Sequence, residues 1–173
     1  MRDIVLELLS SYGYAGMFAL ILIENLFPPI PSEVILTFGG FMTTYTRMNI
    51  AGAVLSATAG SVLGALILYE LGRHIPVQKF YAFLGGAWGK RLGVEVEDVK
   101  DADGWLERTG RSAVFFCRFV PIIRSLISIP AGMAKMELLP FLLLTTAGSL
   151  IWNTVLIGAG VTIGKGSVVR DSI

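Results

Sequence analysis

Two arginines six residues apart, Arg118 and Arg124, interrupt the most apolar part of the sequence, residues 113–134, and Pro121 lies between them. An arginine keeps its proton in a protein. Placing one near the centre of a bilayer costs several kcal/mol unless it faces a wet cavity or an anion. The planar guanidinium group matches the oxygens of a phosphate. The segment therefore predicts an anion-binding element at membrane depth and not a plain membrane span.

Two glutamates, Glu24 and Glu33, stand in a second interrupted segment nearer the N-terminus, on either side of Pro28, Pro29 and Pro31. A buried carboxylate without a cationic partner can exchange protons near neutral pH, whereas one beside an arginine stays ionised and pairs with it. Two interpretations follow. Either the four charged residues only neutralise one another, or the arginines bind an anion while a glutamate couples binding to proton movement. We expect the second, because ionisable groups inside a membrane are functional by default.

The composition places these charges in a membrane protein. Of the 173 residues, 54% are hydrophobic and 16% are charged, and the mean hydropathy is +0.69, which is far from that of an ordinary soluble domain. The net charge of +1 gives no basis for nucleic-acid binding, and the single cysteine, Cys117, excludes an intramolecular disulfide. The first residues include Asp3 and Glu7 and do not resemble a cleavable signal peptide, so we expect internal segments to direct insertion.

The apolar runs predict an all-α integral membrane fold in a single domain, residues 1–173. Residues 2–12 have the spacing of an N-terminal amphipathic helix. Residues 14–23 and 34–43 are each about half the length that a spanning helix needs, and the prolines between them break a helix. They predict a re-entrant hairpin, because irregular backbone at membrane depth is tolerated only against protein or water. One long kinked span over residues 14–42 is the alternative.

Two runs have the length of full transmembrane helices, residues 50–72 and residues 138–163. The first carries small residues at every fourth position, which predicts a face that another helix backbone can approach closely. Residues 73–112 between the hairpins are rich in Lys and Arg, and basic loops mark the cytoplasmic side. We therefore expect this connector to be cytoplasmic. The small residues at every fourth position of the run over residues 50–72 are Gly52, Ser56, Gly60 and Gly64.

An internal repeat relates the two halves of the chain. The sequence predicts two copies of a hairpin plus one span, over about residues 14–72 and 113–163. Because each copy crosses the membrane once, the second must be inverted relative to the first, which is typical of secondary transporters whose sites lie at the repeat interface. At an offset of 92 residues, Phe27, Pro29, Ile30, Ile35 and Gly40 match Phe119, Pro121, Ile122, Ile127 and Gly132, and at an offset of 88 the TAGS motif of residues 58–61 matches residues 146–149.

Several motifs resemble those of the DedA family of bacterial membrane proteins, the SNARE-associated or VTT-domain group, over nearly the whole chain. The resemblance implies a multi-pass protein of the bacterial inner membrane with two opposed re-entrant hairpins. It is carried by Glu24, Pro28-Pro29-Ile30-Pro31-Ser32-Glu33 and Gly39-Gly40, then by Phe116-Cys117-Arg118-Phe119-Val120-Pro121-Ile122-Ile123-Arg124-Ser125 and Ala131-Gly132-Met133-Ala134-Lys135-Met136.

The resemblance also implies a function and a site. Members of the family are linked to moving lipids between leaflets, notably undecaprenyl phosphate and in some cases phosphatidylethanolamine, and to proton coupling. By motif position, the substrate-binding arginines are Arg118 and Arg124, and the proton-coupling acids are Glu24 and Glu33. We expect a lipid flippase with membrane lipids and protons as partners, and a homo-oligomer is left open. The alternatives are a proton-coupled transporter of small solutes or cations in membrane-potential and pH homeostasis, and a membrane scaffold without transport.

We expect no enzyme activity, no cofactor and no metal site. His74 is the only histidine, so a phosphatase-like pair of histidines cannot form. No His, Cys and carboxylate residues stand at the spacing of metal ligands. The glycine-rich residues 85–90 lack the Gly-Lys-Ser/Thr ending of a phosphate-binding loop.

Overall fold

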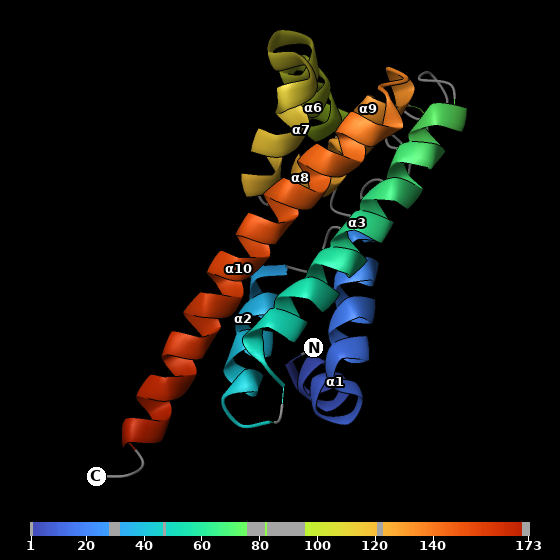
Figure 1. Ribbon diagram of the computed structural model, residues 1–173. Helices are drawn as coiled ribbons and strands as arrows, with labels where there is room; N and C mark the ends of the chain where they lie inside the picture. The colour runs from blue at the N-terminus through green and yellow to red at the C-terminus, as the bar shows by residue number, and fades with distance from the viewer. Residues whose placement is uncertain are drawn as a thin grey trace.

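The structure is a computed structural model that describes residues 2–27, 32–46, 48–75, 82, 96–120 and 123–170. Its regular elements are helices throughout these ranges, which confirms the all-α prediction (Figure 1). In chain order they are α1 (Arg2–Leu26), α2 (Ser32–Thr43), α3 (Ile50–His74), α6 (Val96–Thr109), the 3-10 helix η1 (Gly110–Ser112), α7 (Ala113–Phe116), the 3-10 helix η2 (Cys117–Phe119), α8 (Ile123–Leu126), α9 (Ser128–Met133) and α10 (Leu138–Arg170).

Helices α3 and α10 are both long and apolar enough to cross a membrane. They confirm the helices predicted at residues 50–72 and 138–163. Helix α10 continues seven residues beyond its predicted end, to Arg170. The mixed composition after Ile163 suggested that the helix ends there. Single glycines, however, weaken a helix by only about 1 kcal/mol each and do not stop it.

Helix α1 bends at Gly13, whose φ of 51° lies in the left-handed region that glycine adopts without steric penalty. The segment after the bend packs along α3, on the stripe of small residues that the sequence singled out. A Cβ atom on Gly52 would collide with the ring of Tyr14, and one on Gly60 would collide with the carbonyl oxygen of Phe18. The close approach predicted for this stripe is confirmed, and α1 is the helix that makes it.

Each interrupted segment contains separate helices. Helix α1 ends at Leu26 and α2 begins at Ser32, and the two contact each other side by side (Figure 1). The second segment consists of the short elements α7, η2, α8 and α9. The three prolines of the first segment, together with Pro121 of the second, lie outside the described residues.

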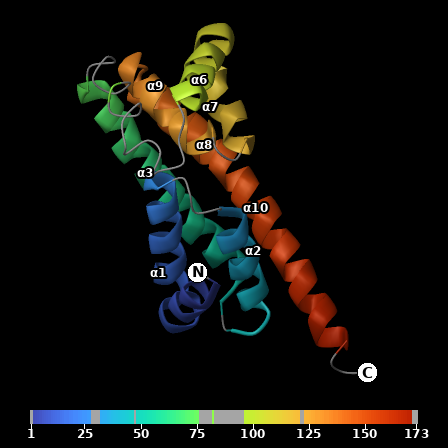
Figure 2. The same cartoon turned by 180° about the vertical axis from the view of Figure 1, so that it is seen from behind.

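The last helix of each interrupted segment packs against the long helix of the other half, α2 on α10 and α9 on α3 (Figure 2). In both contacts, glycines allow the backbones of the two helices to touch. A Cβ atom on Gly40 would strike the carbonyl oxygen of Ile157, and one on Gly160 would strike that of Thr37. Helices α2 and α10 therefore touch backbone to backbone.

The contact between α9 and α3 has the same construction. A Cβ atom on Gly132 would strike the carbonyl oxygen of Tyr69, and one on Gly72 would strike that of Ile129. Adding 92 to the number of each α2 residue gives the equivalent residue of α9, and adding 88 to the number of each α3 residue gives the equivalent residue of α10. These are the two offsets of the sequence repeat, so the equivalent residues of the two halves make equivalent contacts.

The two ends of the molecule differ in what they carry. The N-terminus, the C-terminus and the start of α3 lie at one end, whereas α6 and the end of α3 lie at the other (Figure 1). On α6, Glu97, Lys100 and Asp101 are exposed. Between the two ends, the charged residues of both interrupted segments come together.

Candidate functional site

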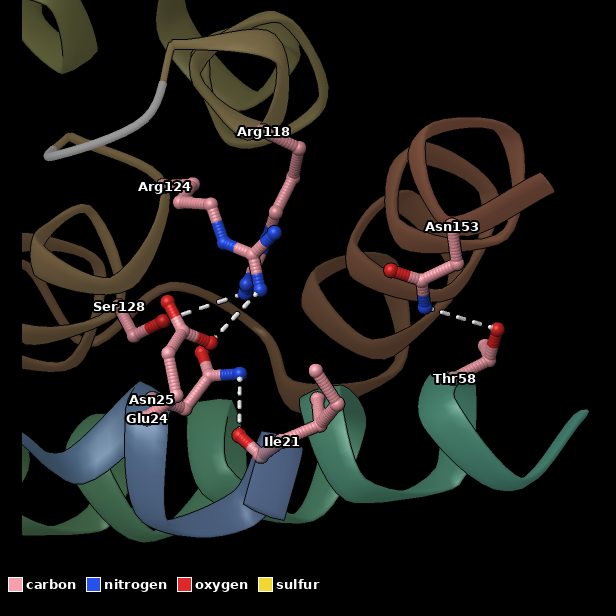
Figure 3. Close-up of polar contacts among 8 residues, drawn as sticks. All are labelled: Ile21, Glu24, Asn25, Thr58, Arg118, Arg124, Ser128 and Asn153. Atoms are coloured by element: carbon pink, nitrogen blue, oxygen red, sulfur yellow. Dashed lines mark hydrogen bonds and ion pairs between the residues drawn. The ribbon is translucent and has the colours of Figure 1, made fainter. Parts of the chain in front are cut away.

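The centre of the molecule holds two arginines and a glutamate that are almost completely buried. The exposed fractions are 1% for Arg118 on η2, 3% for Arg124 on α8 and 5% for Glu24 near the end of α1. Figure 3 shows both guanidinium groups pointing toward Glu24. The interrupted segments explain this convergence, because each one ends a helix in the interior and leaves its charged residues there.

Arg124 and Glu24 form a direct ion pair. The Nη2 atom of Arg124 donates to Oε2 of Glu24 at 3.0 Å, and both side chains are buried. This bond joins the two halves of the chain. The structure thus brings together one predicted arginine and one predicted glutamate.

Arg118 is held by hydroxyl groups and not by a carboxylate. Its Nη2 atom donates to Oγ of Ser128 at 3.3 Å and to Oγ1 of Thr145 at 3.2 Å (Ser128 is drawn in Figure 3). The Nε and Nη1 atoms of Arg118, and Nε of Arg124, are buried and have no hydrogen-bond partner among the described residues. Three nitrogen atoms on two cations, which together carry four N–H groups, are thus left for another acceptor.

Glu33 lies in the first turn of α2 and is half-buried. It is close enough to Glu24 for the two carboxylates to repel each other. Its Oε1 atom is buried and accepts no hydrogen bond from any described residue. The structure therefore brings Glu33 into the same charged cluster but gives it no ion pair with any described residue.

Neutral polar groups extend the site, and the sequence did not predict a role for them. Asn25 is fully buried, donates from Nδ2 to the carbonyl oxygen of Ile21 at 3.3 Å, and has no partner for Oδ1 among the described residues. Asn153 on α10 donates from Nδ2 to Oγ1 of Thr58 on α3 at 3.2 Å, so it bonds between helices. The residues Asn25, Ser128 and Thr145 are polar and lie within apolar runs of the sequence. That contrast was the only indication in the sequence that they belong to the site.

The arrangement is chemically suited to bind an anion. A buried N–H group without an acceptor is unfavourable by about 1–3 kcal/mol, and by more when the group is charged. Oxygens of a phosphate can accept from several guanidinium N–H groups at once. An anion between Arg118 and Arg124 would therefore satisfy donors that the described part of the protein leaves open.

Other parts of the described chain do not contribute to this cluster. A cavity of about 610 Å³ lies between the end of α2, the start of α3 and α10, and is lined by residues such as Thr44, Asn49 and Lys165, but by none of the four charged residues. His74 sits at the exposed end of α3 beside Glu70. Across the described ranges, no three His, Cys, Asp or Glu side chains gather as a metal site would require.

Known proteins resemble this chain over most of its length. The VTT domain model matches residues 30–162. An "Alkaline phosphatase-like protein" of Lactococcus lactis subsp. cremoris is 54% identical over 95% of this chain and 77% of the relative. Proteins named "Undecaprenyl phosphate transporter A" are 41% identical in Staphylococcus aureus, over 94% of this chain and 80% of the relative, and 30% identical in Bacillus subtilis, over 93% and 77%.

No solved structure matches the chain. The match to the domain model covers the span from the first interrupted segment to the greater part of α10, and so includes both arginines and Glu33. The chain belongs to the VTT-domain family, which is the DedA family.

Proposed function

We propose that this protein moves a lipid phosphate, undecaprenyl phosphate or a related phospholipid, between the leaflets of the bacterial inner membrane, coupled to protons. The observation that carries the proposal is Arg118, a fully buried cation whose Nε and Nη1 atoms have no partner among the described residues. A fixed positive charge with open donors at the centre of an apolar protein favours an anionic substrate. The names of the relatives in Staphylococcus aureus and Bacillus subtilis support this choice of lipid.

The head and the tail of the lipid differ in their solvation, and so they need different help from the protein. The charged head is the part that is unfavourable to bring through hydrocarbon, and the prenyl or acyl tail can remain in the bilayer. Arg118 and Arg124 bind the phosphate between the two interrupted segments. Glu24 and Glu33 lie beside that position and supply the carboxylates for proton coupling.

We further propose that the fold is an inverted repeat of a re-entrant hairpin and a transmembrane helix. The repeats cover about residues 14–72 and 113–163, and the connector, residues 73–112, is cytoplasmic. The support is the pair of equivalent glycine contacts, together with the position of α6 at the end opposite both termini. Such an architecture places the site at the repeat interface, where one half can rock against the other and expose it to each side in turn.

We propose transport without hydrolysis. The name "alkaline phosphatase-like" belongs to the Lactococcus lactis relatives and raises the question of phosphate release. His74, the only histidine, lies on the exposed end of α3 and not among the buried arginines. Free phosphate should therefore not accumulate when purified protein is incubated with a lipid phosphate, which a colorimetric phosphate assay measures.

The decisive experiment is flux in proteoliposomes with an NBD-labelled polyprenyl phosphate, scored by accessibility of the label to dithionite. Arg118→Ala should lower the rate at least tenfold, because it removes the open donors. Arg108→Ala, an exposed arginine on α6, is the matched control and should transport normally. Normal flux in both Arg118→Ala and Arg124→Ala would refute the proposal. Loss of a proton-driven cation flux in Glu24→Gln, with no lipid flux in the wild type, would establish the cation-transport alternative.

A further inference from the structure

The end of the molecule that carries both termini has the cavity of about 610 Å³ between α2, α3 and α10 (Figure 1). We propose that this cavity is a second binding site for the phosphate head of the lipid, at the outer surface of the membrane, with Lys165 as its cation. This second site rests on the proposed function and extends it. The central arginines bind the head at mid-depth, and the cavity holds it before or after it crosses.

The lining of the cavity offers hydrogen-bond donors to an anion. Lys165 is the only charged residue among the described residues that line it, and it pairs with no described acid. The Oδ1 atom of Asn49 accepts from the backbone N–H of Gly52 at the start of α3, which leaves the Nδ2 end of the same amide as a donor. An ammonium group and an amide N–H group are both good partners for a phosphate oxygen.

The rest of the lining suits the first carbons of a lipid tail. Met48, Ile50 and Val161 contribute apolar side chains. The hydroxyl groups of Thr43 and Thr44 donate to carbonyl oxygens of the preceding turn of α2, so they remain in the wall of the cavity as acceptors. Donors and an apolar wall together favour a phosphate that carries a hydrocarbon chain over free phosphate.

The position of the cavity along α10 matches the depth of lipid head groups. Thr145 contacts Arg118, and Val161 lines the cavity. The distance between these two positions along a helix is about 24 Å. Half the thickness of a bilayer with its head groups is about 20–22 Å, so a tilted α10 brings the cavity to the membrane surface when the arginines are at mid-depth. Tyr14 and Tyr45 are exposed at the same end, and tyrosine is enriched where a membrane meets water.

The cavity and the arginines are separated by an apolar contact. Buried residues follow every fourth position of α10, a row inclined to the helix axis, and they change from polar to apolar along it: Thr145, Ser149 and Asn153, then Ile157 and Val161. At Ile157 the backbone of α10 touches Gly40 of α2. The two sites should therefore bind ligand independently while α2 and α10 stay in contact.

The experiment observes the cavity directly through Met48. Purified protein with ¹³C-methyl methionine is titrated with farnesyl phosphate in detergent micelles, and the Met48 methyl signal, assigned with Met48→Leu, is followed by NMR. The signal should shift in the wild type and equally in Arg118→Ala, because the cavity does not use the central arginines. Farnesol, which lacks the phosphate, and inorganic phosphate, which lacks the chain, should produce no shift at the same concentrations.

Variants of Lys165 test the cation. Lys165→Gln should raise the farnesyl phosphate concentration at half the maximal shift by about two- to fivefold, the size of one exposed ion pair. Lys165→Glu should raise it further, because it adds a repulsive charge. Lys165→Arg should behave as wild type, and so should Lys100→Gln, which removes an exposed lysine on α6 at the opposite end.

Flux in proteoliposomes supplies the second measurement. Lys165→Glu should need more labelled lipid for half-maximal flux and keep its maximal rate. The second site is overturned if the Met48 signal does not respond, if Arg118→Ala abolishes its response, if Lys165→Glu titrates as wild type, or if farnesol or inorganic phosphate shifts it equally. Absence of lipid flux in the wild type would instead refute the proposed function, so the two failures are distinguishable.

Discussion

Arg124 and Glu24, 100 residues apart in the sequence, form an ion pair of 3.0 Å between Nη2 and Oε2 in the buried centre of the protein. The pair connects the end of α1 in the first half with α8 in the second. A buried charge whose partner is removed is strongly destabilising, whereas replacement of both partners by apolar residues of similar volume can be nearly neutral. This bond is therefore both a structural link between the halves and part of the proposed binding site.

The first prediction is a double-mutant cycle on this pair. Glu24→Gln and Arg124→Gln should each destabilise the protein by about 3–5 kcal/mol, because each leaves one buried charge unpaired. The double variant should be more stable than the sum of the two losses by roughly 0.5–3 kcal/mol. Unfolding by SDS titration in mixed micelles, followed by helical circular dichroism, measures these differences. Additive losses would show that the two residues do not interact in the folded protein.

The second prediction separates the charge of Arg118 from its geometry. Arg118→Lys keeps the positive charge but replaces the planar group by a single ammonium, which cannot present two parallel donors. Loss of one hydrogen bond to a charged group, worth about 1.5–3 kcal/mol, should weaken the binding of a labelled polyprenyl phosphate roughly 10- to 100-fold. Equilibrium binding in nanodiscs measures the change.

The control for Arg118→Lys is Arg111→Lys, since Arg111 is exposed and pairs with Glu137 at the protein surface. It should bind the lipid as wild type does. If Arg118→Lys also binds with wild-type affinity, the guanidinium group does not bind the phosphate through two donors. Binding would then require only a positive charge at this position.

The sequence predicted the parts of this structure that leave a long or chemically distinct signal. A run of apolar residues longer than 20 predicted α3 and α10. Charged residues within an apolar run singled out Arg118 and Arg124, and the structure buries both of them. The repeat offsets also predicted which glycines would be equivalent. Gly40 and Gly132 were matched from sequence alone, and both make backbone contact with a long helix.

Other features depend on three-dimensional contacts and leave no such signal. Helices α7, α8 and α9 have four to six residues each, which is too short for helical periodicity to appear. Ser128 and Thr145 hold Arg118, yet hydroxyl residues in apolar helices often bond only to their own backbone. The pairing of α2 with α10 could not be predicted, because it follows from the crossing of the two halves.

The third prediction concerns that crossing. Gly160→Ala and its counterpart Gly72→Ala should each destabilise the protein by about 1–3 kcal/mol or more, because the added methyl group meets a backbone carbonyl that cannot rotate away. Equal losses at the two positions are expected if the halves are equivalent. SDS titration again measures the free energy of unfolding.

Helix α10 offers a matched control two residues away from Gly160. Nothing lies within 4 Å of a Cβ atom built on Gly158. Gly158→Ala should therefore be neutral or slightly stabilising, since alanine favours a helix by about 1 kcal/mol over glycine. A loss at Gly158 as large as that at Gly160 would mean that helix propensity or lipid contacts, and not the contact with Thr37, determine the effect.

The fourth prediction tests the proposed topology by chemical labelling. Cys117 is buried and free, so Cys117→Ser gives a background without native thiols. Tyr45→Cys, in the turn after α2, and Lys100→Cys, on α6, place thiols at exposed positions at opposite ends of the molecule (Figure 1). A membrane-impermeant maleimide added to intact cells or right-side-out vesicles should label only Tyr45→Cys, because the basic connector that carries α6 is expected on the cytoplasmic side.

Inverted vesicles should reverse this pattern and label Lys100→Cys alone. The proposed topology requires this reversal, because in it α3 crosses the membrane once between the two positions and each re-entrant hairpin begins and ends on its own side. Labelling of both thiols from the same side would mean that α3 does not span the bilayer. The two interrupted segments would then open to one side, and a site between them could not be exposed alternately to the two leaflets.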